Sequence, residues 1–111
     1  MRSQTIVRPF FKKVTDNTVH QVYSGKAYID RIIWHNDDNA ARFMQIFNKL
    51  STDVVLATTT PDQVIQLGAD STQTFPFGDV IFDIGFSFAI TTTRNGSTEG
   101  QISDVMVGTS N

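Results

Sequence analysis

The chain has 111 residues, no cysteine, 18% charged residues and a formal net charge of −2. This length suits one domain with its own core, and the lack of cysteine excludes disulfides, thiolate catalysis and cysteine-based zinc sites. The slight negative charge is untypical of a nucleic-acid binder. No apolar run approaches the ~20 residues of a membrane helix, and the N-terminus lacks the apolar region of a secretory leader.

Residues 1–14 begin the chain with a basic segment, which we expect to be an extended N-terminal arm or an edge strand. Residues 1–13 contain four cations and no acid. Pro9 lies within this segment, and proline is tolerated in a sheet only at an edge or a bend. Residues 15–111 are then expected to form the folded domain, and deletion of residues 1–13 is expected to leave that fold intact.

Short runs of alternating apolar and polar residues, separated by turn residues, predict strands in the first half of the domain. The first run covers residues 18–23 and ends at a Ser-Gly turn. The next run, "AYIDRIIWHN" at residues 27–36, has large apolar residues in both alternating sets, which predicts a central strand with one face buried and the other partly covered. The segment "RFMQIFNKL" at residues 42–50 fits both a helix and a strand, and its β-rich neighbourhood favours a strand.

The second half of the chain begins with a Thr-Pro-Asp turn and a strand centred on residues 64–67. The segment "GADSTQTFPFG" leads into the next apolar stretch, and Gly78 and Gly85 mark bends or bulges. In "GFSFAITTT", the large residues Phe86, Phe88 and Ile90 occupy every second position, so alternation directs them toward a core and the small residues between them toward water or another surface. Asn95-Gly96 then predicts a tight hairpin to a last strand at residues 102–107.

These elements predict an all-β chain that forms a single-domain antiparallel β-sandwich, either jelly-roll-like or Ig-like, with an extended N-terminal arm.

Few residues are arranged for catalysis or metal binding. His20 and His35 lie in different predicted strands, and a strand histidine is more often a hydrogen-bonded structural residue than a base. The stretch "HNDDN" at residues 35–39 offers oxygen ligands to a hard cation, but an exposed turn closed by Asn and Asp explains it better. We therefore assign no catalytic, cofactor-binding or metal-binding residue and expect no enzymatic activity.

Aromatic and glycosylation patterns leave two further alternatives. Trp34 and Tyr28 would form a sugar-stacking platform if both were exposed, although the sole Trp of a small sandwich is more often a core residue. Asn95-Gly96-Ser97 matches the N-glycosylation pattern, but the predicted turn accounts for the same residues.

The stretch "VRPFFKK" at residues 7–13 is the strongest candidate for a contact with another protein. In an extended strand Phe10 and Phe11 point to opposite faces, so both cannot enter the same core. One interpretation buries one ring and leaves the other, with Arg8, Lys12 and Lys13, for a partner. The alternative is that neighbouring loops cover both rings.

The chain also resembles a known group of proteins. The order "AARFMQIFNK", "VIQLGA", "FPFGDVIFDIGFSFAITTT" and "ISDVMV", over about residues 28–107, resembles small β-sandwich structural proteins of tailed-phage virions. The resemblance implies a non-enzymatic virion protein made in the host cytoplasm. Its first implied role is a capsid decoration protein bound to the major capsid protein, and its second is a tail or collar accessory.

The partners expected from this interpretation are other virion proteins and further copies of the chain, with a trimer as one arrangement, but neither nucleic acid nor membrane. Apolar residues on both faces of the strand at residues 27–36 motivate the homo-oligomer. The rival hypothesis is a carbohydrate-binding or receptor-binding module that uses Trp34, Tyr28 and the loop at residues 36–39. An enzyme that pairs His35 with Asp37 is the last alternative.

Overall fold

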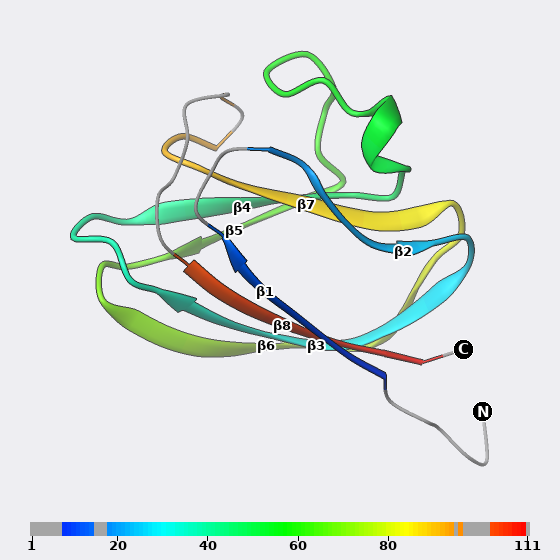
Figure 1. Cartoon of the computed structure of the whole chain (residues 1–111), viewed down its shortest axis with the longest axis horizontal. Coiled ribbons are helices and arrows are strands. Elements are labelled where there is room, and N and C mark those ends of the chain that lie inside the picture. The colour runs from blue at the N-terminus through cyan, green and yellow to red at the C-terminus, as the bar shows by residue number, and fades with distance from the viewer. Residues whose placement is uncertain (1–7, 15–17, 95, 97–102, 111) are drawn as a thin grey trace.

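The predicted β-sandwich is confirmed, because the computed structural model consists of two four-stranded antiparallel sheets packed face to face (Figure 1). The structure describes residues 8–14, 18–94, 96 and 103–110, without the side chains of residues 8, 9, 79 and 110. Its elements are, in chain order, β1 (Arg8–Val14), β2 (His20–Ser24), β3 (Ala27–Asn36), β4 (Arg42–Phe47), the 3-10 turn η1 (Ser51–Asp53), β5 (Gln63–Leu67), β6 (Ser71–Phe82), β7 (Gly85–Thr91) and β8 (Ser103–Ser110). Within these residues, no helix has the length and apolar character that would let it cross a membrane.

The strand order identifies the sandwich as a jelly roll. Sheet A has the order β1-β8-β3-β6, and sheet B has the order β2-β7-β4-β5. The strands pair as one long hairpin would, β1 with β8, β2 with β7, β3 with β6 and β4 with β5. This hairpin is rolled up so that β3 also pairs with β8 and β4 with β7. Eight strands in two such sheets form a jelly roll, which decides between the two predicted sandwich types.

The core lies between the sheets and is built from alternate residues of each strand, as period-two patterning requires. Burying each large apolar side chain contributes about 1.5–3 kcal/mol. The core residues are Val14, Ala27, Ile29, Ile32, Trp34, Met44, Ile46, Leu67, Phe82, Phe86, Phe88, Ile90, Val105 and Val107.

The predicted hairpin between the last two strands is wrong. β7 pairs with β2 and β4 in sheet B, whereas β8 pairs with β1 and β3 in sheet A. The last two strands therefore lie in different sheets and do not form a hairpin with each other. Asn-Gly favours a tight turn locally, but it does not determine which strand the chain joins next. Asn95 and Ser97, and with them the glycosylation pattern, lie outside the described residues.

A bulge in β3 changes which of its residues face the core. The register of β3 against β8 shifts between Ile29 and Arg31, so Asp30 is an extra residue in this strand. An extra residue of this kind changes the face of the sheet to which each later side chain of the strand points. As a result Ile29, Ile32 and Trp34 all lie in the core with no exposed surface. The apolar residues that the sequence seemed to place on both faces are thus mostly on one face.

Residues 68–78, to which no strand was assigned from the sequence, lie largely within β6, which runs from Ser71 to Phe82. Pro76 lies within β6, which is an edge strand, where proline is tolerated. Gly78 has a φ of +63° and lies where β6 shifts register against β3, which confirms the bulge predicted there. The ambiguous segment at residues 42–50 contains β4, as predicted.

Candidate interaction surface

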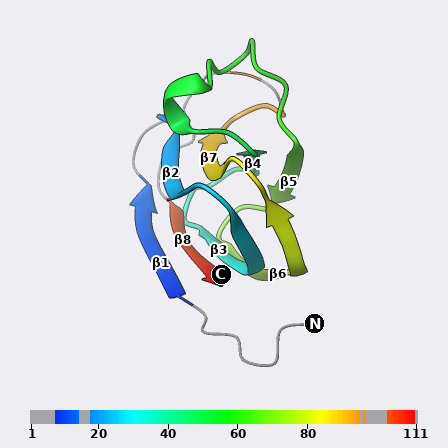
Figure 2. The ribbon, with the colours of Figure 1, turned by 90° about the vertical axis from the view of Figure 1, so that its right-hand side faces the viewer.

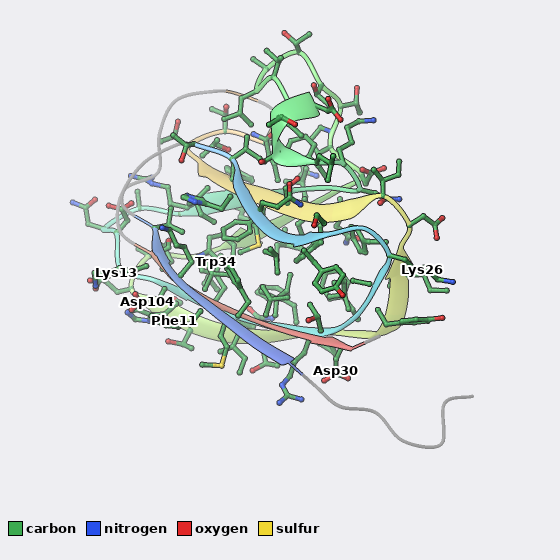
Figure 3. All side chains as sticks on the ribbon, turned by 45° about the vertical axis from the view of Figure 1, so that its right-hand side comes forward. Phe11, Lys13, Lys26, Asp30, Trp34 and Asp104 are labelled. Atoms are coloured by element: carbon green, nitrogen blue, oxygen red, sulfur yellow. The ribbon has the colours of Figure 1, made fainter. Side chains whose placement is uncertain are left out.

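Strand β1 places Phe10 and Phe11 on opposite faces of sheet A. Phe10 is partly buried and packs against the core, whereas the side chain of Phe11 is 61% exposed. Of the two alternatives left open by the sequence, the structure shows the one in which one ring is partly buried and the other is exposed. Figure 3 shows Phe11 with Lys13 and Asp104 outside sheet A, while Trp34 lies between the sheets. Residues 1–7 lie outside the described residues, so the part of the predicted arm that the structure describes is an edge strand.

An apolar row crosses the outer face of sheet A at the level of Phe11. Phe11 is opposite Met106 on β8, and Met106 is opposite Ile33 on β3. Residues directly opposite each other in an antiparallel pair have neighbouring side chains on the same face. Met106 is 40% exposed and Ile33 is partly buried. We call Phe11, Met106 and Ile33 the outer row. Met106 was not identified from the sequence, although it alternates with Val105 and Val107 and therefore points away from the core.

Polar residues border the outer row on one side. Lys13 lies opposite Asp104, and its Nζ is 3.7 Å from Asp104 Oδ1. Both side chains are well exposed, so this ion pair adds little to stability. On the next strand His35 Nδ1 is 2.6 Å from Thr72 Oγ1. Lys12, also predicted as a contact residue, is exposed between Phe10 and the buried Val14. Arg8 pairs by its backbone with Thr109.

The outer face of sheet B is covered by the chain itself. Residues 48–62, which we call the covering segment, pass over this sheet (Figure 1). Ser87 Oγ donates to Lys49 O over 2.9 Å, and Asp62 N donates to Ile46 O over 2.8 Å. Phe47 lies on this face and is nevertheless fully buried. Of the small residues of β7 that were expected to face water or another surface, Ser87 thus faces the covering segment, whereas Thr91 accepts from Gln45 Nε2 and donates to Thr93 O.

The histidines do not meet. His20 lies on β2 in sheet B and His35 on β3 in sheet A. His35 Nε2 is 3.7 Å from Asp37 Oδ1, which is longer than a hydrogen bond. The Asp37 side chain is more than half exposed, so the pair lies on an open sheet face and lines neither of the hollows described below.

The loop at residues 36–39 is a turn bonded to its own backbone, as favoured from the sequence, but two of its residues, Asn36 and Asp38, are buried and not exposed. Asn36 Oδ1 accepts from Asp38 N at 3.0 Å, which is the local backbone bond typical of Asx turns. The carboxylate of Asp38 accepts from Arg42 Nε at 3.0 Å, whereas Asp37 approaches His35. The two carboxylates therefore have different partners. Across the described part of the chain, no three His, Cys, Asp or Glu residues form a group that would hold a metal ion.

Trp34 and Tyr28, considered as a platform for sugar stacking, do not form one exposed surface. Trp34 is a core residue with no exposed surface, and its ring centroid is 6.4 Å from that of Phe75. Tyr28 lies near the N-terminal end of β3, and the Lys26 Nζ is 5.7 Å from its ring centroid. A buried indole offers no face for stacking, so the predicted core position of Trp34 is confirmed.

Two adjoining hollows lie on the side of the sandwich where β5 and β6, the edge strands of the two sheets, come together (Figure 2). Their volumes are about 240 and 230 Å³, and both are lined by Gln63, Phe77 and Val80. Ile65 and Phe75 line the first, and Asp62 lines the second. These residues were not singled out from the sequence, because the approach of β5 to β6 depends on the topology.

No known protein family and no curated protein matches the chain by sequence. Among solved structures, the chain is similar to the coat protein of Tobacco streak virus. The two have 6% sequence identity and a TM-score of 0.44, and the alignment covers 100% of this chain and 88% of that chain.

Proposed function

We propose that this chain is a structural protein of a tailed-phage virion that attaches to neighbouring virion proteins through the outer row and strand β1. Its first role is capsid decoration by protein–protein contacts, without catalysis. The resemblance of residues 28–107 to tailed-phage structural proteins motivates the assignment to a virion. Jelly rolls occur in viral capsid proteins but also in lectins and cupins, so the fold alone does not select a function.

The difference between the two outer sheet faces carries the proposal. Sheet B is closed by the covering segment, whereas no described segment of the chain covers the outer row of sheet A in this way. Phe11 and Met106 are 61% and 40% exposed and are opposite each other across neighbouring strands. Burying one such side chain contributes about 1.5–3 kcal/mol. This is small beside the cost of association, so firm attachment requires many copies on a symmetric particle.

Detection of the chain in purified particles tests the role. Particles from a lysate that contains the chain would be banded on a density gradient, and their head and tail fractions would be analysed by mass spectrometry. The proposal expects the chain in the head fraction. Recovery with tails alone would contradict the decoration role and favour a tail or collar accessory, and recovery only in the soluble fraction would overturn the proposal.

A pair of matched substitutions tests the surface. Phe11→Ser removes the most exposed residue of the outer row, and Val55→Ser removes an equally exposed apolar side chain from the covering segment, each being 61% exposed in the native chain. Both changes are expected to leave stability within about 0.5 kcal/mol, as is usual for surface positions. Phe11→Ser should lower particle occupancy several-fold, whereas Val55→Ser should not. Equal occupancy for both variants would remove the outer row from the contact.

A further inference from the structure

The hollows between β5 and β6 form an apolar depression at one edge of the sandwich. Three residues of its lining are partly buried and pack against the core, namely Ile65, Phe75 and Phe77. Val80 and Ile81, along its rim, remain 45% and 46% exposed although both lie within a strand. Exposed apolar side chains gathered around a depression are typical of protein contact sites.

The segment of sequence that contributes the lining of this depression is acidic. Between Lys49 and Arg94 the sequence contains five aspartates and no lysine or arginine. Asp62 lines the second hollow, and Asp83, directly after β6, is exposed. A partner for this edge is therefore expected to be cationic and to carry an apolar side chain.

Strand β1 has both properties. It presents the exposed ring of Phe11 and the exposed Lys13 on the outer face of sheet A, and the exposed Lys12 on the opposite face of the same edge. These residues belong to a stretch of thirteen residues that has four cations and no acid. However, β1 and β6 are the two opposite edges of sheet A, and Figure 2 shows β1 and β2 on one side with β5 and β6 on the other. The basic edge and the acidic depression of one molecule cannot meet each other.

We propose that they meet between copies, with the β1 edge of one chain docking into the β5–β6 depression of a second copy. The contact is heterologous, because two different surfaces are joined. Such contacts build closed rings when the rotation between copies closes and open chains when it does not. The proposal deepens the proposed function, on which it rests, by making a second copy of the chain the neighbouring virion protein that receives Phe11.

The contact is made by side chains and does not extend the sheet. Both edges contain proline, Pro9 in β1 and Pro76 in β6, and β6 also bulges near Gly78. Proline, bulges and edge lysines hinder the addition of a strand. Their presence on both edges favours the insertion of Phe11 between apolar side chains, with lysines facing aspartates.

Cysteine cross-linking tests the pairing directly, because the native chain has no cysteine. Lys12→Cys marks the basic edge and Gln63→Cys marks the depression, and both native residues are exposed. The two variants, one of them isotopically labelled, would be mixed and treated with a short bismaleimide. Mass spectrometry then separates mixed dimers from dimers of a single variant. We expect the mixed 12–63 dimer in at least several-fold excess over the 12–12 and 63–63 dimers.

Gln66→Cys is the matched control for the depression. It is exposed on the same strand, but it alternates with Ile65 and Leu67 and lies on the opposite face of β5. Lys12→Cys should cross-link to position 66 several-fold less than to position 63. Added salt and Phe11→Ser should each reduce the 12–63 product, because salt screens the opposite charges and the substitution removes the inserted ring. Val55→Ser should leave the yield unchanged.

A predominance of 12–12 dimers, or equal yields at positions 63 and 66, would overturn the head-to-tail contact. Absence of any cross-link at the highest soluble concentration would do the same. If the chain is nevertheless found in phage heads, the proposed function stands without this contact. If the 12–63 product forms but no particle contains the chain, the contact stands and the virion role falls.

Discussion

Asn36 shows how one side chain joins two parts of the jelly roll. It has no exposed surface, and its amide nitrogen donates to Ala40 O, Leu67 O and Gly68 O over 3.0–3.2 Å. Its amide oxygen accepts from Asp38 N. The end of β3, the turn that follows it and the end of β5 are thus held by a single residue.

Asn36→Ala is expected to destabilise the chain by about 1–3 kcal/mol, because it leaves buried backbone groups without a partner. Asn36→Asp should destabilise the chain more than Asn36→Ala, since a carboxylate would face three carbonyl oxygens. Urea unfolding followed by circular dichroism measures both changes. Gln66→Ala, at an exposed position, serves as the control and should stay within about 0.5 kcal/mol of the native chain. An Asn36→Ala variant as stable as this control would contradict the structural role.

The burial of Trp34 gives a second prediction, which concerns its fluorescence. Because the only Trp of the chain has no exposed surface, its fluorescence is expected at shorter wavelength than that of free tryptophan and should be quenched little by acrylamide. Unfolding in urea should reverse both properties. Strong quenching in the folded chain would show that the indole is accessible and would revive the sugar-stacking hypothesis.

Among the elements, Gln21 connects β2, β7 and the covering segment. Its Nε2 donates to Tyr23 O at 2.7 Å and to Phe86 O at 3.3 Å, and its Oε1 accepts from Ser51 N at 2.5 Å. Gln21→Ala is expected to cost about 1–3 kcal/mol. It should also raise hydrogen exchange at the Ser51 amide beyond the change at core amides, since that amide loses its acceptor. A uniform change at all amides would contradict a specific tie to the covering segment.

Strand positions were predictable because alternation is a local property. Most strands were placed to within a few residues, and the division of Phe10 from Phe11 followed from strand geometry alone. Pairing partners were not predictable, because they depend on contacts between distant segments. The bulge at Asp30, the pairing of β8 with β1 and β3, and the depression beside Val80 all arise from such contacts. This also explains why Met106 joined the outer row only once the register of β8 was known.

At the scale of the whole molecule, the jelly-roll topology gives the first and the last strand different positions in sheet A. The C-terminal strand β8 is central in sheet A and pairs with both β1 and β3, whereas the N-terminal strand β1 is an edge and pairs with β8. β8 also supplies Val105 and Val107 to the core. Sheet A is therefore incomplete until the last residues of the chain are in place, and the loss of β8 removes two strand pairings instead of one.

Deletion of residues 103–111 is accordingly expected to leave an unfolded chain, with neither β-sheet circular dichroism nor dispersed NMR signals. Deletion of residues 1–13 should lower the midpoint of thermal unfolding and leave a folded core, since it removes an edge strand and the partly buried Phe10. That truncation therefore weakens the fold as well as any partner contact, which is why Phe11→Ser is the cleaner test of binding. A folded chain without residues 103–111 would contradict the central place of β8, because β1 and β3 would then be stable without the strand that joins them.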